Sequence, residues 1–487
     1  MGQTVRTMAE MEVGTTGWNE LLFPDGTARP AAVALVAQLR QLGLAELQER
    51  QNLAELDILA MGITFTVYSD GRGTDRAWPF DIIPRVIAAA EWRQVEAGLK
   101  QRLTALNRFI DDLYNDQNVL HDGIIPSDIV MSSPNFRPEC MGSSPKFGVW
   151  AHICGTDLVR DGDGTMRVLE DNLRVPSGVS YMLQNRAISK RAFADVFRQQ
   201  SILPVDDYPG QLRRLLLSLA PDSVAGRQPS VVVLTPGVFN SAYFEHTFLA
   251  QSMGAALVEG ADLYVDNDDR VFMRSIGGPQ PVDVIYRRVD DLFLDPECFR
   301  SDSMLGVPGL MRAWRSGNVA IANAPGAGVA DDKVIYSWVP NLIRYYLNEE
   351  AILPNVATYR CSEPDDLAYV VRNAAELVLK PANESGGYGI TIGDRATAAE
   401  LAEAVAKVKA EPRNWIAQPI LTLSTAPTIC DDRLSPRHLD LRPFVLSGQD
   451  TYVTTGGLTR VALVEGSLIV NSSQGGGSKD TWIVETP

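Results

Sequence analysis

The sequence predicts an α/β fold, with α+β parts that contain antiparallel strands. The first observation is a buried strand at 231–234, which is followed by a helix through Met253 and by a second buried strand at 282–288. The second is another strand–helix–strand series within 376–420. Such an order is typical of a mostly parallel sheet that is covered by its connecting helices. The third is a hairpin rich in acidic residues within 157–172.

The composition is that of an ordinary globular protein and excludes several functional classes. The chain has 487 residues, 45% of them hydrophobic, and a formal net charge of −16. This charge disfavours binding to nucleic acid or to an anionic membrane surface. No apolar run is long enough to predict a membrane span, and the first residues lack the apolar core of a signal peptide. Five scattered cysteines without CxxC spacing suit a reducing cytoplasm.

The N-terminal part is predicted to be mainly helical. Residues 29–58 and 86–115 carry apolar side chains at helical intervals, and ITFTVY (63–68) has the composition of a strand. FDIIP, between two prolines, is predicted to be a buried connector, and 120–148 a loop.

The stretch GTDLVRDGDGTMRVLEDN predicts a hairpin that carries metal-binding side chains. A two-residue turn at Asp163-Gly164 places Asp157 opposite Glu170, with Asn172 further along the same face. A four-residue loop over 161–164 would place Asp157 opposite Val168, still on that face, and only an odd-length loop would break the shared face. Two carboxylates and an amide oxygen suit Mg²⁺. The alternative is the solvated polar face of an edge hairpin.

Two lysines downstream supply candidate phosphate contacts. Lys380 ends a buried strand, where an unpaired ammonium would be costly, and Lys333 begins a helix predicted over 333–349. A glycine-rich stretch follows Lys380 and would let backbone N–H groups approach a phosphate; its members are Gly386, Gly387, Tyr388 and Gly389. Gln418 ends another strand and is a candidate contact for an adenine edge. Each feature also has an ordinary alternative. The glycine-rich stretch is then a flexible turn, Lys333 is a solvated helix residue, and Gln418 is the end of an ordinary strand.

The C-terminal part is predicted to return to strands after a loop over 421–437. The predicted strands are LDLRPFVL, TYVTTGG, RVALVE and LIVNSS. The segment SSQGGGSKDTW has no assigned role in this interpretation beyond a tail cap.

Together these residues resemble the ATP-grasp ligases, in which such lysines, a glycine loop and a hinge strand hold ATP and a Glu-x-Asn pair with an Asp holds Mg²⁺. Here the metal residues precede the lysines, which resembles the circularly permuted ATP-grasp family (type 2), distantly similar to glutathionylspermidine synthetase. The matching stretches cover nearly the whole chain: GITFTVY, PFDIIPR, EDNLRVPSGVSYML, TPGVFNSAYFEH, VIYRRVDD, DDKVIYSWVP and NSSQGGGSKDTW.

The resemblance implies an ATP-grasp fold with permuted domain order. Residues 1–200 would hold the N-terminal helices and the metal hairpin, and 201–330 a Rossmann-like pre-ATP-grasp layer. Residues 331–425 would form the nucleotide-binding lid with the glycine loop, and 426–487 strands that return to the core.

The resemblance also implies a carboxylate–amine ligase that uses ATP and Mg²⁺ through an acyl phosphate. Arg442 and Arg174 would stabilise charge on the transferring group. The residues suggested for substrate contact are Ser177, Ser180, Tyr181, Asn240, Glu245, His246, Arg287 and Arg288. For the two adjacent arginines, pairing with Asp290 or Asp291 is the alternative.

Two further interpretations stay open at this stage. One is a catalytically idle ATP-binding or partner-binding scaffold, and the other a kinase that stops at phosphoryl transfer. The partners expected are a small carboxylate and a small amine, neither of which the sequence identifies. The sequence is compatible with a homo-oligomer but does not set the oligomeric state.

Overall fold

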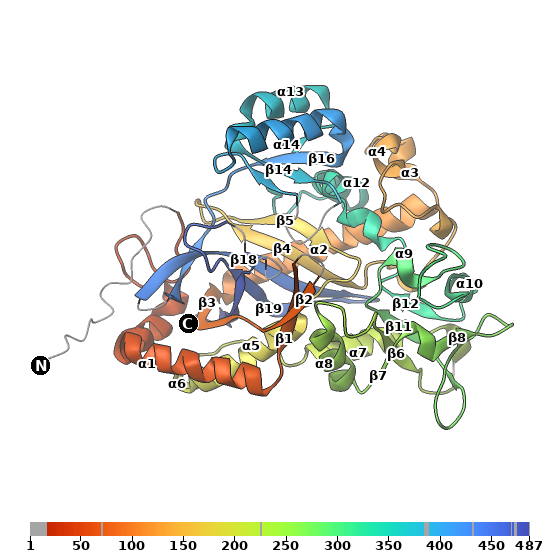
Figure 1. The fold of residues 1–487 in the computed structure, drawn as a ribbon, viewed down its shortest axis with the longest axis horizontal. Coiled ribbons are helices and arrows are strands. Elements are labelled where there is room, and N and C mark those ends of the chain that lie inside the picture. The colour runs from red at the N-terminus through yellow and green to blue at the C-terminus, as the bar shows by residue number, and fades with distance from the viewer. Residues whose placement is uncertain are drawn as a thin grey trace, which may run out of the picture.

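The computed structural model describes residues 17–69, 72–224, 226–383, 389–430, 433–468, 470–471 and 475–486. It is a mixed α/β structure with several sheets (Figure 1). No helix in these ranges is both long and apolar enough to cross a membrane.

The largest sheet joins distant parts of the chain and lies at the centre of the molecule (Figure 1). Its strand order is β3-β20-β19-β18-β4-β5, and β17 pairs with β18. All pairs are antiparallel except β20 with β3. The strands are β3 (Phe80–Ala88), β4 (Ile153–Arg160), β5 (Met166–Asn172), β17 (Thr425–Cys430), β18 (Arg433–Ser447), β19 (Thr451–Val461) and β20 (Gly477–Val484). The sheet therefore brings the acidic hairpin, β4–β5, next to C-terminal strands.

Helices cover both faces of this sheet. Helix α2 (Ala89–Tyr114) packs in one apolar cluster with Val445 and Ile483, whereas α1 (Val33–Ala60) and α5 (Val179–Ala192) pack in another with Phe444 and Trp482. Adjacent residues of a strand point to opposite faces, so the two clusters lie on opposite sides of the sheet. The helices predicted over 29–58 and 86–115 are confirmed.

A second sheet is entirely parallel and has the order β12-β11-β6-β7. Its elements are β6 (Val231–Leu234), β7 (Ala256–Val258), β11 (Val284–Arg287) and β12 (Ala320–Ala322), with α7 (Tyr208–Ser218), α8 (Tyr243–Met253) and α10 (Leu310–Arg315) nearby. The parallel sheet expected from the strand–helix–strand order is confirmed. A small sheet of β8 (Leu263–Val265), β9 (Val271–Met273) and β10 (Gln280–Pro281) projects from this part.

A third sheet, antiparallel throughout, has the order β13-β16-β14-β15 and lies with its two helices at the top of Figure 1. Its elements are β13 (Tyr359–Arg360), α13 (Pro364–Asn373), β14 (Leu377–Pro381), β15 (Thr391–Ile392), α14 (Ala398–Ala410) and β16 (Trp415–Pro419). The helix of the strand–helix–strand series predicted within 376–420 is α14, and Thr397 and Glu400 form a reciprocal capping box at its start.

Five predicted elements were wrong. The loop over 120–148 contains the helix Ser127–Met131, and LIVNSS forms no strand at its described residues 468, 470 and 471. FDIIP belongs to the edge strand β3; its Pro84 lies within an irregular stretch of the β3–β20 register, a place where a missing N–H is tolerated. The helix over 333–349 is two helices, α11 (Lys333–Tyr336) and α12 (Val339–Leu347), because Pro340 interrupts the ladder. The loop over 421–437 contains β17 and the start of β18.

From Gly477 on, the C-terminal motif forms a strand instead of a tail cap. Every residue of β20 is buried, and Lys479 donates hydrogen bonds to Ile83 O at 3.1 Å and Pro427 O at 3.0 Å, in addition to its ion pair with Asp81. The remaining short elements are β1 (Thr64–Ser69), β2 (Arg72–Ala77), α3 (Asn118–His121), α4 (Ser127–Met131), α6 (Ala194–Gln199) and α9 (Asp291–Leu294).

Candidate functional site

The acidic hairpin pairs Asp157 with Glu170, as predicted, but by another route. The turn is not the predicted two-residue turn: Asp161 N–H donates to Thr165 O at 3.1 Å, and Gly164 has φ 84°. This is a three-residue loop, of the odd length that should break the pairing. The pairing is restored because the register shifts by one residue between Asp157 and Leu158, which leaves Leu169 unpaired as a β-bulge.

Two arginines from the C-terminal strands hold Asp157. Arg442 donates to Asp157 Oδ1 at 2.5 Å and to Oδ2 at 2.8 Å, and Arg460 donates to Oδ2 at 2.6 Å. Arg460 also pairs with Asp440, its direct cross-strand partner in β18. The result is a buried network of alternating charges.

Electrostatics within the network keep Asp157 ionised. Burial disfavours its charge, but the Arg442 and Arg460 guanidinium groups outweigh burial and hold the pKa of this carboxyl well below its usual range. Asp440 behaves differently: burial raises its pKa, the neighbouring Asp157 charge raises it further, and Arg460 only partly compensates.

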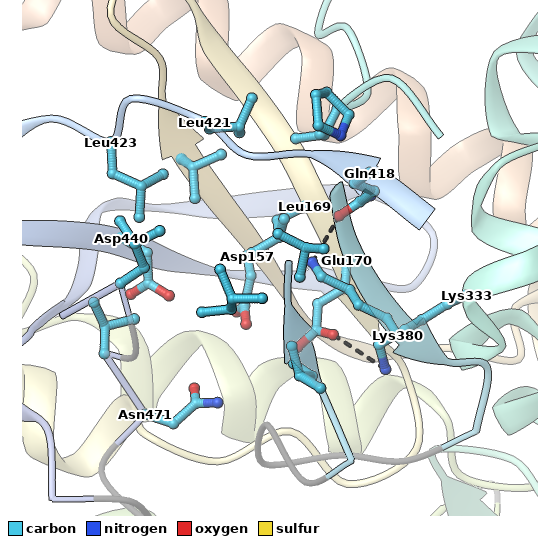
Figure 2. A pocket seen from close by; sticks show the side chains of 18 of the residues that line it. Asp157, Leu169, Glu170, Lys333, Lys380, Gln418, Leu421, Leu423, Asp440 and Asn471 are labelled. Atoms are coloured by element: carbon cyan, nitrogen blue, oxygen red, sulfur yellow. Dashed lines mark hydrogen bonds and ion pairs between the residues drawn. The ribbon is translucent and has the colours of Figure 1, made fainter. Parts of the chain in front are cut away.

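The two predicted lysines converge on this hairpin. Lys333 Nζ lies 3.4 Å from Glu170 Oε2, and Lys380 Nζ donates to Gln418 Oε1 at 2.6 Å (Figure 2). The backbone N–H of Lys333 donates to Ala382 O at 3.0 Å, which joins the start of α11 to the end of β14. Asp332 caps that helix by accepting from Val334 N at 2.9 Å. Burial is the main cause that lowers the pKa of Lys380 to about 8.

A cavity encloses these groups between the central sheet and the third sheet. Its polar lining consists of Asp157, Glu170, Lys333, Lys380, Gln418, Asp440, Arg460 and Asn471. Apolar side chains form the rest of its wall: Val159, Leu169, Val356, Val378, Ile390, Ile392, Leu421, Leu423, Leu468 and Val470. A cavity with an apolar wall and a few convergent charges is typical of a site for a small molecule. We call it the first cavity.

A second cavity adjoins the first. Glu170, Arg460 and Asn471 line both cavities. The second also contains predicted residues, since Asn172, Arg174, Ser177, Tyr181 and Arg442 are all in its wall. Arg174 is held there by Asp331 at 2.8 Å and Asp290 at 3.2 Å. Two predicted sets of residues, one for phosphates and one for substrate, thus border each other.

The residues predicted for a metal supply oxygen donors of the kind that suits Mg²⁺, although both oxygens of Asp157 also accept from arginines. Asp157 and Glu170 supply two carboxylates, and Asn172 donates its Nδ2 to Gly155 O at 3.0 Å, which leaves its side-chain oxygen for a cation. Mg²⁺ usually takes one or two carboxylates and completes its shell with water and phosphate oxygens. In the described part of the chain, no group of three or more His, Cys, Asp or Glu side chains is arranged to hold a metal ion.

Other predicted substrate residues are buried away from both cavities. Glu245 accepts from Ser180 Oγ at 3.0 Å and from Arg288 at 3.0 Å, and His246 Nδ1 lies 2.8 Å from Thr235 Oγ1. Arg287 pairs with Asp291 at 2.6 Å, the alternative considered for this residue. Their position does not support substrate contact.

Glu245 instead fixes the turn before α5, because it also accepts from Gly178 N at 2.8 Å. Asn240 caps its own loop through Ala242 N at 2.9 Å and lines neither cavity. Of the predicted glycine loop, Gly389 is described and has φ 71°, whereas Gly386, Gly387 and Tyr388 lie outside the described residues.

Three residues of the site were missed in the sequence. Asp440 lies two positions before Arg442 on one strand, so alternation alone would have placed both on one face. Arg460 is its cross-strand partner, a relation that needs the register of β18 and β19. Asn471 lies within LIVNSS, which was predicted as a strand, and nothing in that prediction pointed to a role in the site.

Known proteins resemble the chain over most of its length. Residues 84–462 match the family model described as circularly permuted ATP-grasp type 2. An uncharacterized protein from Synechocystis sp. is 55% identical over 96% of this chain and 97% of its own length, and one from Mycobacterium tuberculosis is 48% identical over 97% and 85%.

Two further matches are more distant. A protein from Frankia casuarinae, whose name proposes a glutamate–cysteine ligase, is 42% identical over 96% of this chain but only 54% of its own length. Among solved structures, a glutathione synthetase-like effector from Globodera pallida has a TM-score of 0.59 and 12% identity, and covers 95% of this chain and 100% of its own. That likeness concerns the fold alone, while the sequence matches establish that this chain belongs to the circularly permuted ATP-grasp type 2 family.

Proposed function

We propose that the chain is an ATP-dependent ligase that joins a carboxylic acid to an amine through an acyl phosphate. The observation that carries this proposal is the shared border of the two cavities. Residues suited to phosphates and a cation line the first cavity, and Glu170, Arg460 and Asn471 connect it to the second.

ATP would occupy the first cavity. Its apolar wall suits the adenine ring, and Lys333 and Lys380 suit the phosphates at the end where Glu170 lies. Gln418 already accepts from Lys380 and donates to Thr358 Oγ1 at 3.0 Å, so its side chain orients the lysine. Asp157, Glu170 and Asn172 would hold Mg²⁺, which when bound offsets the negative charge of the phosphates.

The acid would occupy the second cavity, with its carboxylate towards the shared residues. A carboxylate oxygen would attack the γ-phosphorus, ADP would leave, and the amine would then displace phosphate from the acyl carbon. Arg442 would stabilise charge on the transferring group. The contacts that support this role are its hydrogen bonds to Asp157 and, at 3.3 Å, to Ser177 O. Arg174, held by two carboxylates at the wall of the second cavity, would stabilise the oxyanion formed on amine attack.

The layer formed by the parallel sheet would correspond to the Rossmann-like pre-ATP-grasp part, and residues 331–425 would correspond to the lid.

The alternative function, a catalytically idle scaffold, predicts ATP binding without turnover. The name of the Frankia relative suggests an acid–amino acid pair, although this chain spans about half of that protein.

The direct test is ADP release from ATP and Mg²⁺ with panels of amino acids, small peptides and polyamines, followed by product mass. A ligase gives ADP, phosphate and a product lighter by one water than the two substrates together. A kinase would give a phosphorylated acid in the absence of any amine. ATP binding without ADP release for every pair would favour the scaffold.

A further inference from the structure

Three aromatic side chains from different elements meet in the wall of the second cavity. They are Phe65 of β1, Trp78 just after β2 and Tyr181 of α5, here called the aromatic wall. Trp78 stacks on Tyr181 with ring centroids 3.8 Å apart and an interplanar angle of 19°. Phe65 meets Trp78 edge-on at 5.9 Å and Tyr181 at 6.2 Å. Such clusters offer a large apolar surface with a defined geometry.

The aromatic wall belongs to the second cavity and not to the first. The reacting carboxylate must approach the residues that both cavities share. The remainder of the acid therefore extends from Glu170 and Arg460 into the space that the aromatic wall borders. This part of the acid should therefore be apolar or aromatic, so that it can pack against the rings of the aromatic wall.

The β1–β2 hairpin that supplies Phe65 pairs with no other strand of the described sheets. It is held in place over the cavity by Tyr181, whose hydroxyl donates to Thr64 O at 2.9 Å, and by Thr66 N, which donates to Ser241 O at 3.2 Å. Trp78 is only 3% exposed, and its indole N–H has no hydrogen-bond partner among the described residues. A buried donor usually has a partner, and because Trp78 lines the second cavity, a ligand oxygen bound there could supply one.

The charges of the second cavity limit the acid further. Its guanidinium groups are already paired: Arg174 with Asp290 and Asp331, and Arg442 and Arg460 with Asp157. The cavity can accept the one carboxylate that reacts, but among the described residues that line it there is no unpaired guanidinium for a second. A dicarboxylic acid such as glutamate would bury an unpaired charge there.

We propose, on the basis of the function proposed above, that the acid substrate is a monocarboxylic amino acid or peptide with an aromatic side chain beside its reacting carboxylate. The ring of that side chain packs against Phe65 and Trp78. The indole N–H of Trp78 donates to an oxygen of the same substrate.

The first measurement is binding, which does not depend on turnover. Protein loaded with Mg²⁺ and a non-hydrolysable ATP analogue is titrated with L-phenylalanine, L-alanine and L-glutamate. Phenylalanine should bind about tenfold or more tightly than either of the others, as burial of a phenyl group predicts. Equal affinity for all three, or preference for glutamate, would overturn the proposal.

The second measurement uses variants and ADP release with the best amine found. Phe65→Leu should lower the ratio of kcat/KM for phenylalanine to kcat/KM for alanine about tenfold. Trp78→Phe, which keeps a ring, should lower kcat/KM for phenylalanine less than Phe65→Leu does. The matched control is Tyr264→Leu, which removes one ring from the stacked Tyr264–Phe272 pair outside both cavities.

The outcomes separate this proposal from the proposed function. ADP release with small hydrophilic acids only, unchanged in Phe65→Leu, would overturn the aromatic preference and leave the ligase intact. Preferential binding of phenylalanine that Phe65→Leu abolishes, without ADP release for any pair, would support the aromatic wall and refute the ligase. Unchanged affinity for the ATP analogue in each variant shows that the fold is retained.

Discussion

Arg442 donates to Asp157 at 2.5 Å although 285 positions separate the two residues in the chain. The contact exists because β18 pairs with β4 in the central sheet. It places a guanidinium directly on a carboxylate that we propose as a metal ligand. Asp157 is therefore ionised before any cation binds, and a cation must compete with Arg442 and Arg460 for its oxygens.

Replacing Glu170 by Gln should abolish turnover while the fold stays intact. The change removes one of two carboxylates proposed to hold Mg²⁺ but keeps the size of a half-buried side chain. We expect ADP release to fall by about 10²-fold or more, together with a higher Mg²⁺ requirement. Asp163→Asn, in the exposed turn of the same hairpin, is the control. Normal activity of Glu170→Gln would remove this residue from the metal site.

ATP affinity should decrease as the pH rises through about 8, the pKa of Lys380 in the folded chain. The lysine is charged below that pH and loses the charge above it, so the phosphates lose a partner. At pH 9 the dissociation constant should be about tenfold higher than near pH 6, because about one molecule in ten still carries the proton. Titration calorimetry at fixed free Mg²⁺ measures this.

The variant Lys380→Met should bind ATP weakly at every pH, without the loss of affinity that accompanies rising pH in the natural chain.

The stability of the ligand-free protein should respond to pH in the opposite direction and increase as the pH rises. Because the folded pKa lies below the ordinary value of 10.5, the cost of holding the charged lysine disappears as the pH rises from about 8 towards 10.5. A step of equal size in Lys380→Met would assign the pH dependence to another group.

Arg460→Met should destabilise the protein, because it leaves Asp440 buried without its partner. Breaking a buried pair from one side costs about 3–5 kcal/mol. The double variant Asp440→Leu/Arg460→Met removes both charges and should recover most of the lost free energy of unfolding, since Asp157 keeps Arg442. Urea unfolding of the two single variants and the double variant measures the coupling. Additive losses would show that the pair is not coupled.

Lys479→Met should also be strongly destabilising, although the residue lies near the end of the chain. Its ammonium is fully buried and joins β20 to Asp81 on β3 and to Pro427 O on β17. Loss of the cation leaves the Asp81 carboxylate uncompensated, at a cost of about 3–5 kcal/mol. The control Lys407→Met, on the exposed face of α14, should change the free energy of unfolding by less than about 0.5 kcal/mol. Equal effects in the two variants would contradict a structural role for the C-terminal strand.

Local pattern was sufficient for elements whose stability is set by near neighbours. The amphipathic spacing of α2 and the capping box of α14 are legible without any distant contact. The pattern failed where a distant partner decides the conformation. FDIIP is a strand only because β20 pairs with it, and residues 425–430 are a strand only because β18 does.

By itself, the sequence determined which chemical groups are available: an acidic hairpin, two lysines at the ends of local elements and an arginine on a C-terminal strand. Only the tertiary structure decided that they meet. The Leu169 bulge that turns Glu170 towards Asp157, the pairing of Arg460 with Asp440 and the border between the two cavities all depend on strand register. Register is fixed when a whole sheet buries its faces and satisfies its hydrogen bonds together. No short stretch of residues specifies that register by itself.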